Sequence, residues 1–235
     1  PIEDRFILQE HGRCPFLNDA NLCDIYTELG EDKLCETCTN FPRHITEFGG
    51  TREIGISLSC PVAVELIMKR TEPITFTVSE NDEKISGYND IDASLYFELC
   101  QAREVAYGIC QDRSMGIKHR AALLLDFSFA LQKKLKKRKC GEVTALYKDK
   151  EYLAQRFAAL EKKYSGYKKT QQTLKEWLRV YNGLEHIKPE WTDMLSKLEA
   201  FVANGITNIH ETAEAVNERE YEYEHLLVYY VYRYF

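Results

Sequence analysis

Five cysteines with close spacing occupy the first 60 residues of this 235-residue chain. They are Cys14, Cys23, Cys35, Cys38 and Cys60, with the spacing C-x8-C-x11-C-x2-C-x21-C. The Cys35–Cys38 pair places two sulfurs on one side of a turn or helix, where both can reach one metal at about 2.3 Å. Thiolates that converge from short loops are the ligands of zinc ions and iron–sulfur clusters. The spacing therefore predicts a metal centre. A thioredoxin-like redox pair is disfavoured because no βαβ pattern surrounds it.

Two of these cysteines precede a proline, at Cys14-Pro15 and Cys60-Pro61. A Cys-Pro pair is common at iron–sulfur ligands, and Cys60 also precedes a predicted helix, whose N-terminal dipole favours a thiolate. The alternative is an ordinary structural cap of that helix. Five candidates exceed the four ligands of one tetrahedral zinc, so either one is a spectator or the centre is larger. His44 is a further candidate ligand, although a surface or packing role is the better interpretation.

The remaining cysteines, Cys100, Cys110 and Cys140, follow no ligand spacing. Cys100 and Cys110 are ten residues apart on one predicted helix, which separates them by about 15 Å along its axis. They cannot share one ion, and we predict that they are thiols of the hydrophobic core.

Charge is distributed unevenly along the chain. Residues 1–60 contain 5 Lys and Arg against 11 Asp and Glu, a balance of -6, whereas the remaining 175 residues contain 26 of each sign. An acidic head lacks the basic face that phosphate contacts need, so we expect no nucleic-acid partner. A transcription factor with a zinc-stabilised head is disfavoured for the same reason.

The first residues, Pro1-Ile2-Glu3-Asp4, do not resemble a secretory signal. The longest apolar run, 226–232, stops at Arg233 and is far shorter than the roughly 20 residues that span a bilayer. We therefore expect a cytoplasmic protein with no membrane partner. Its eight cysteines are then reduced thiols and metal ligands and not a disulfide framework.

The cysteine-rich part is predicted to be rich in loops. A short helix is expected within 25–33, a strand over 53–58 that follows the Gly49-Gly50 turn, and a helix over 61–69 that ends before Pro73. A second short strand is expected over 74–78.

Residues from Ser94 onward have the apolar periodicity of helices. Breakers are predicted at Met115-Gly116, Cys140-Gly141, Ser165-Gly166, Asn182-Gly183, Pro189 and Asn204-Gly205. We predict five or six helices of roughly 12–22 residues. The fold class is therefore mainly α: a Cys-rich metal-binding domain at 1–80, a linker at 81–92 and an α-helical domain at 93–235. No Gly-rich nucleotide loop is present, so a Rossmann-type pocket for a methyl donor is not visible.

A string of motifs in residues 10–70 resembles the flagellin lysine-N-methylase family of bacteria. The motifs are Gly12-Arg13-Cys14-Pro15-Phe16-Leu17, Leu22-Cys23-Asp24-Ile25-Tyr26, Leu29-Gly30-Glu31, Leu34-Cys35-Glu36-Thr37-Cys38, Phe41-Pro42-Arg43-His44 and Ser57-Leu58-Ser59-Cys60-Pro61. The string is similar also to a wider class of Cys-rich domains that chelate zinc or iron. We expect that the chain lacks the Cys-rich segment that precedes these motifs in the family.

The resemblance implies transfer of a methyl group from S-adenosylmethionine to lysine side chains of flagellin or of another protein substrate. It implies an iron–sulfur cluster, of the 4Fe-4S type, held by Cys14, Cys23, Cys38 and Cys60, with Cys35 as the fifth candidate; zinc is the alternative metal. The residues themselves identify no catalytic base and no donor-binding residue. The other hypothesis is a non-enzymatic module that binds zinc or iron, joined to a helical domain that binds a protein partner.

Overall fold

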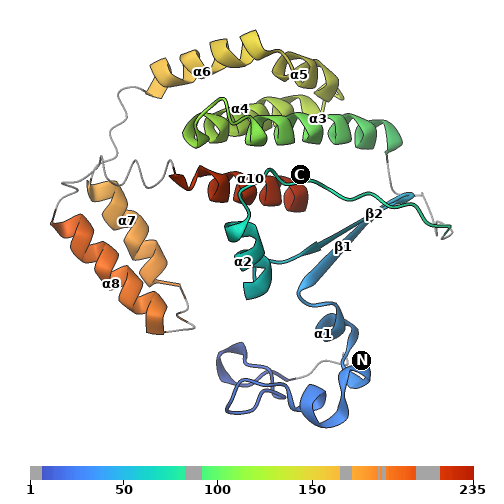
Figure 1. Cartoon of the computed structure of the whole chain (residues 1–235), viewed down its shortest axis with the longest axis vertical. Coiled ribbons are helices and arrows are strands. Elements are labelled where there is room, and N and C mark those ends of the chain that lie inside the picture. The colour runs from blue at the N-terminus through green and yellow to red at the C-terminus, as the bar shows by residue number, and fades with distance from the viewer. Residues whose placement is uncertain (1–6, 83–91, 165–170, 185, 187–188, 205–217) are drawn as a thin grey trace. The chain divides into compact units, whose positions relative to one another are not determined.

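A computed structural model describes residues 7–82, 92–164, 171–184, 186, 189–204 and 218–235 of the protein (Figure 1). Contacts between Cα atoms divide the chain into two compact units. The first ends at Glu65, and the second contains Leu66–Asp82 together with the described residues from Asp92 onward. The domain boundaries expected from the sequence stay a prediction.

The first unit consists of short turns followed by one β-hairpin. Its helical turns are Glu10–Gly12, Ile25–Leu29, Glu31–Lys33 and α1 (Glu36–Asn40). Strands β1 (Arg43–Phe48) and β2 (Thr51–Ile56) pair in antiparallel register, from Arg43 opposite Ile56 to Phe48 opposite Thr51. The strand predicted over 53–58 is confirmed as β2, two residues earlier than expected. Its partner β1 was not predicted, although exposed and half-buried residues alternate along it as in any strand with one covered face.

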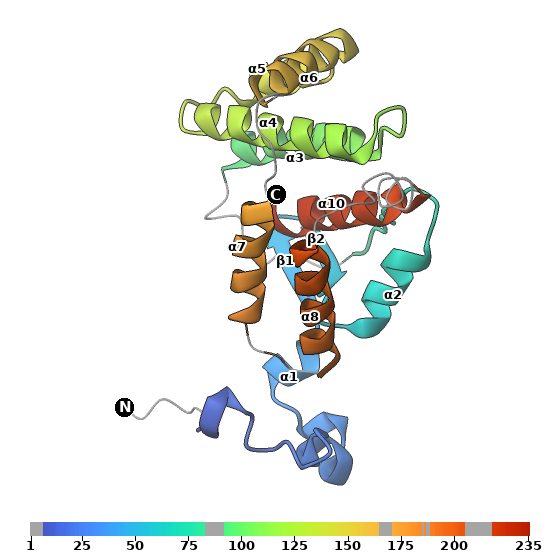
Figure 2. The same ribbon diagram turned by 90° about the vertical axis from the view of Figure 1, so that its left-hand side faces the viewer.

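The second unit is built on the antiparallel helices α3 (Ala93–Gln111) and α4 (Ile117–Leu135). Helix α10 (Glu220–Tyr234) packs on one side of this pair, and α5 (Cys140–Tyr147) and α6 (Lys150–Tyr164) pack on the other (Figures 1 and 2). Because each helix contributes an apolar stripe, three layers of helices bury a common core.

Apolar residues spaced three and four apart on α3 and α4 form the centre of this core. The buried residues are Ala102, Val105, Ala106, Ile109, Cys110, Leu123, Phe127, Leu131, Cys140, Val143, Tyr147, Val228 and Val231, with Tyr107 beside them. Each large side chain in such a core contributes roughly 1.5–3 kcal/mol through burial. The core-thiol prediction is confirmed for Cys110, which is fully buried, whereas Cys100 is half-buried. Cys140, for which no such prediction was made, is also fully buried.

An extended segment without regular secondary structure follows α2 (Pro61–Lys69) and lies in the second unit. We call residues 67–76 the strap; they are the last three residues of α2 and the extended residues that follow it. Gln111 Nε2 donates a hydrogen bond of 2.8 Å to the carbonyl of Ile74, and Arg113 Nη2 donates one of 2.8 Å to the carbonyl of Thr71. The strap is thus bonded to the end of α3.

Helix α10 holds the strap through His225, which is fully buried. Its Nδ1 lies 2.9 Å from the carbonyl oxygen of Ile67, and its Nε2 lies 2.9 Å from that of Glu72. The strand predicted over 74–78 is therefore wrong: the strap bonds to helix side chains and not to a neighbouring strand.

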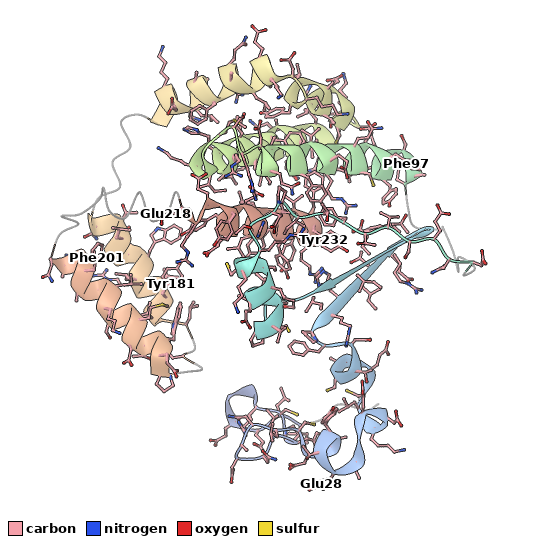
Figure 3. All side chains as sticks on the ribbon, viewed as in Figure 1. Glu28, Phe97, Tyr181, Phe201, Glu218 and Tyr232 are labelled. Atoms are coloured by element: carbon pink, nitrogen blue, oxygen red, sulfur yellow. The ribbon has the colours of Figure 1, made fainter. Side chains whose placement is uncertain are left out.

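Phe76 ends the strap and, although 44% exposed, packs its ring against two tyrosines of the helices. Its ring centroid lies 4.8 Å from that of Tyr107 on α3 and 5.3 Å from that of Tyr232 on α10, a residue labelled in Figure 3. Ring pairs at these distances add about 0.5–1.5 kcal/mol each beyond the burial of their area.

We expect Phe76→Ala to lower the free energy of unfolding by about 1–2 kcal/mol, because two ring contacts and part of a large apolar side chain are lost. Chemical denaturation followed by circular dichroism measures this change. The matched control is Val78→Ala, since Val78 is 88% exposed and its truncation should change stability by less than about 0.5 kcal/mol. Equal effects of the two substitutions would contradict the packing role of Phe76.

Helices α7 (Gln171–Asn182) and α8 (Pro189–Ala203) pack on each other as a helical hairpin. Leu178, Leu195 and Val202 form its small core, with Leu174 and Trp191 packed against them. The predicted breakers at Asn182-Gly183 and Pro189 are confirmed as the end of α7 and the start of α8. The Ser165-Gly166 breaker lies outside the described residues.

The expectation of a mainly helical protein is confirmed, and α2 begins at Pro61 as predicted. The breaker at Met115-Gly116 separates α3 from α4 as expected, but Cys140 and Gly141 are the first two residues of α5 and the break before it is the turn at 136–139. The break between α5 and α6 was missed because no glycine or proline marks it; there Asp149 accepts hydrogen bonds from the backbone N–H groups of Glu151 and Tyr152 and so begins α6. None of the helices in the described ranges combines the length and the apolar character needed to cross a bilayer.

Candidate functional site

The loop between Cys14 and Cys23 is organised by two polar side chains. Arg13 donates hydrogen bonds of 2.6 Å to the Asn21 side chain and to the backbone carbonyl of Asn18. The Asn18 side chain accepts from the backbone N–H of Leu22 and donates to Asp24, at 3.1 and 2.8 Å. Asn favours such turns because its short amide can replace a backbone partner. These bonds close the loop on itself.

Backbone pairing at the neck of this loop fixes where its cysteines lie. Leu17 forms an antiparallel bridge with Cys23, and the N–H of Asp24 donates a hydrogen bond of 2.9 Å to the carbonyl of Phe16. Cys14 precedes this neck by two residues and Cys23 lies within it. The nine-residue separation in sequence therefore becomes proximity in space.

Cys35 and Cys38 lie at the start of α1, with Cys35 as its N-terminal flanking residue. Their sulfur atoms are 3.5 Å apart, and both thiols are exposed and free. Two sulfurs each bound at about 2.3 Å to one tetrahedral ion would be about 3.8 Å apart. The pair thus has nearly the separation that a shared metal requires, and it is far outside the roughly 2.05 Å of a disulfide.

The two thiols of the pair differ in acidity. The pKa of Cys35 is lowered, chiefly because the backbone N–H of Cys38 and then the Cys38 thiol hydrogen-bond its sulfur. The pKa of Cys38 is raised, first by its hydrogen bond to Cys35, then by partial burial and by the negative charge of Cys35, Cys14 and Cys23. Cys35 is therefore the first of the pair to become a thiolate, which is the form that binds metal.

The negative charges of Cys14 and Cys23 also contribute to raising the pKa of Cys38. Within the described part of the chain, however, no three His, Cys, Asp or Glu side chains are already close enough to hold one ion. The thiols suit a metal that prefers sulfur ligands. The loops would have to move before three or more of them could bind one ion.

Cys60 lies where the chain leaves β2 and enters α2. Cys60 precedes α2, and its N–H donates a hydrogen bond of 3.0 Å to the carbonyl of Ser57. The N–H of Ser57 in turn bonds to the carbonyl of Pro42 at 2.8 Å, so the hairpin returns the chain to a point four residues after Cys38. His44 is a half-buried residue of β1. The ligand role of Cys60 stays a prediction.

Sequence patterns did not reveal a buried ion network in the second unit. Glu224 on α10 is fully buried and accepts hydrogen bonds from Arg120, at 2.6 Å, and twice from Arg113, at 2.9 Å. Arg120 is 1% exposed and also donates 2.9 Å to the carbonyl of Cys110 and 3.1 Å to Glu220. A bidentate Arg–carboxylate pair has the geometry of the strong ion pairs in proteins.

The electrostatics of this network favour the charged form of Glu224. Burial alone would raise its pKa, but hydrogen bonds from Arg113 and Arg120 outweigh burial and the pKa is lowered. The network joins α3, α4 and α10, and its partners are more than 100 positions apart in sequence. No local motif could therefore predict it. The only local signal was the unusual placement of charged residues inside apolar helices.

A second charged cluster joins α4, α5 and α6. Arg156 donates hydrogen bonds of 2.8 and 2.6 Å to Asp126, and the Tyr147 hydroxyl donates to the same carboxylate. Burial alone would raise the pKa of Asp126, but Arg156 and then Tyr147 outweigh it and the pKa is lowered. The cluster fixes the angle between the helices that border the groove described below.

The sequence from residue 103 to residue 235 matches the family described as the FliB lysine N-methylase C-terminal domain. The chain is 32% identical over 69 residues to a protein named Lysine-N-methylase from Salmonella typhimurium, covering 29% of this chain and 17% of that protein; a Salmonella choleraesuis protein of the same name gives the same values. It is 28% identical over 99 residues to the Flagellar biosynthetic protein FliU of Salmonella muenchen, covering 42% of this chain and 53% of that protein.

The chain thus spans at most about half the length of these relatives, 17% of the first two and 53% of the third. No solved structure is significantly similar to it. The family match covers more than half of the chain, including α4 to α10 and most of α3. The chain therefore belongs to the FliB lysine N-methylase family.

Proposed function

We propose that this chain is part of a lysine N-methyltransferase that acts on flagellin, with S-adenosylmethionine as methyl donor and an iron–sulfur centre bound by cysteines. The observation that carries the proposal is the family match over residues 103–235. The name Lysine-N-methylase of two relatives supports the reaction class, and the name of the third supports a flagellar context.

The cysteines of the first unit support the metal part of the proposal. Cys35 and Cys38 have a sulfur separation close to that of two ligands of one ion, and Cys14 and Cys23 lie near enough to affect the acidity of Cys38. These four thiolates would hold the cluster, with Cys60 completing or replacing one of them. A bound iron–sulfur cluster would supply a redox-active centre and a brace for the loops.

The chain's own residues have defined tasks in this proposal. Cys35 ionises first and binds first, because its thiolate is stabilised by the N-terminal backbone of α1. The loop closed by Arg13 and Asn18 carries Cys14 and Cys23 to the same place. In the substrate, a lysine must lose its proton before its nitrogen can attack a methyl group.

A second candidate is a non-enzymatic module that binds zinc or iron and contacts a protein partner through its helices. It is favoured by one observation: the 3.5 Å separation of the Cys35 and Cys38 sulfur atoms suits two ligands of one metal ion whether or not the protein is an enzyme. Zinc fits the same thiolates.

We expect the protein, purified without oxygen, to contain iron and acid-labile sulfide and to transfer labelled methyl groups from S-adenosylmethionine to lysines of flagellin. Mass spectrometry of flagellin peptides identifies the methylated residues. Cys110→Ala is the matched control, because that thiol is buried and outside the cysteine-rich unit, and it should keep both properties. Zinc without transfer would favour the second candidate and reject the enzyme.

A further inference from the structure

A groove of about 290 Å³ lies where α3 passes the end of α5 and the start of α6. Its α3 wall carries Glu104, Gly108 and Asp112, which are spaced four residues apart. Residues at this spacing lie on one face of a helix, one turn above the other. The groove therefore has a carboxylate at each end of this wall and a gap without a side chain between them.

The floor of the groove is apolar. Val105 and Ile109 of α3 are 7% and 2% exposed, and Tyr147 and Leu153 complete the floor from α5 and α6. A floor of this kind suits the hydrocarbon part of a ligand, because contact removes apolar surface of both from water. The groove thus combines an apolar floor with charged ends.

Gly108 is the feature that keeps the groove open. A glycine in the middle of a helix costs about 1 kcal/mol relative to alanine, yet no heavy atom lies within 4 Å of the place where its Cβ would be. Packing against a neighbouring helix therefore does not demand the glycine. Any larger residue would extend into the space above the groove floor.

The two carboxylates have different partners. Asp112 accepts hydrogen bonds from the N–H and hydroxyl of Ser114, and these bonds, followed by the charge of Lys150, lower its pKa. Glu104 is exposed and forms no hydrogen bond or ion pair with the described residues. Glu104 is therefore the carboxylate that is available to a cationic ligand.

We propose that this groove binds the lysyl side chain of the protein substrate. The four methylene groups of the lysine would lie on Val105 and Ile109 above Gly108, and the ammonium group would bond to Glu104. This inference rests on the proposed function and names the place where its substrate enters. Small-molecule pockets usually measure about 300–1,000 Å³, so a groove at the lower limit suits one side chain better than a nucleoside-sized methyl donor.

The opposite rim bears on where a bound ammonium group lies. Lys148 and Lys150 line this rim and are exposed. Like charges close to one another are disfavoured. The two lysines therefore direct the ammonium group of a bound lysine away from themselves and toward Glu104.

Binding of two small amides to the complete protein tests the proposal. The probes are Nα-acetyl-lysine N-methylamide and its norleucine counterpart, which has the hydrocarbon chain without the amine. We expect the lysine amide to bind at least threefold more tightly than the norleucine amide by nuclear magnetic resonance titration. We expect Glu104→Gln to remove this preference while leaving norleucine binding unchanged.

Substitution of the glycine gives the sharper test. Gly108→Leu should weaken binding of both amides at least tenfold, because the leucine side chain fills the groove, while the melting temperature is unchanged or higher because leucine favours helix. Gly141→Leu is the matched control: this helical glycine on α5 also has no heavy atom within 4 Å of a Cβ position, and it does not line the groove. It should bind both amides as the wild type does.

Three results would overturn the groove assignment: equal affinity for the two amides, unchanged binding in Gly108→Leu, or displacement of the lysine amide by S-adenosylhomocysteine. Methylation of flagellin separates this inference from the proposed function. Normal methylation by Gly108→Leu would reject the groove and keep the enzyme. Absence of methylation by the wild type, with lysine binding that depends on Gly108, would reject the enzyme and keep the groove.

Discussion

Replacing Glu224 with glutamine is expected to lower the free energy of unfolding of the helical unit by about 3 kcal/mol. The substitution preserves the shape of the side chain but leaves the buried Arg120 without its closest carboxylate, 2.6 Å away. Removing one partner of a buried ion pair typically costs about 3–5 kcal/mol. We expect the lower limit because Glu220 and the carbonyl of Cys110 still accept from Arg120. Urea unfolding followed by circular dichroism measures the change.

Glu222→Gln provides the control on the same helix. Glu222 pairs with Arg219, whose side chain is 64% exposed, and an ion pair at the surface contributes about 0–1 kcal/mol. The two substitutions remove the same charge from α10 at positions two residues apart. A similar loss of stability in both would contradict the special role of the buried network.

The loss of stability at acid pH should also depend on the Glu224 carboxylate. The pKa of Glu224 is lowered in the folded protein, so its contribution is present above the unfolded value of about 4.3 and is lost as pH falls through the lowered folded value. The wild type should therefore lose stability below about pH 5, and Glu224→Gln should lose less over the same range. Asp126 adds to the loss in both proteins because its pKa is also lowered.

Cys38→Ala is expected to reduce the bound metal at least tenfold and to loosen the first unit. Cys38 forms the sulfur pair with Cys35 and is the thiol on which the charges of Cys14 and Cys23 act. A thiophilic centre that loses one ligand of such a pair keeps too few thiolates for stable coordination. Metal analysis of the protein purified without oxygen measures the loss, and proteolysis of residues 7–60 measures the loosening.

Cys110→Ala is the matched substitution outside the cysteine-rich unit. Burial raises the pKa of the Cys110 thiol to about 12, so this residue does not become a thiolate near neutral pH. Its loss should cost about 1 kcal/mol of packing and leave the metal content unchanged. Equal metal content in the Cys38 and Cys110 variants would reject the ligand assignment. A parallel Cys60→Ala variant should lose metal if Cys60 belongs to the centre.

Helix positions in this protein were predictable where a local signal existed. The breakers at Gly116 and Pro189 mark the starts of α4 and α8, because glycine and proline act on their own backbone, whereas Gly141 is a helical residue of α5. The strap was not predictable, because its path depends on Gln111 and His225, which are 37 and more than 150 residues away from their acceptors. Residues 74–78 were predicted to form a strand, but among the described residues no strand pairs with them.

The candidate site was predictable in its chemistry and only partly in its geometry. Cysteine spacing identified the Cys35–Cys38 pair, because side chains three residues apart on a helix are neighbours on its surface. The approach of Cys14 and Cys23 needed the loop bonds of Arg13 and Asn18, which a spacing pattern does not reveal. The groove above Gly108 was missed because its walls come from three helices.

The side chains that hold the strap also determine where the helical part can be cut from the rest of the polypeptide. A fragment that began after Phe76 would remove the carbonyl acceptors of the His225 ring and of the Gln111 amide and expose both side chains to water. Each hydrogen bond lost in this way contributes about 0.5–1.5 kcal/mol to stability. A fragment that contains the helical part alone should therefore begin before Ile67, so that it includes the strap.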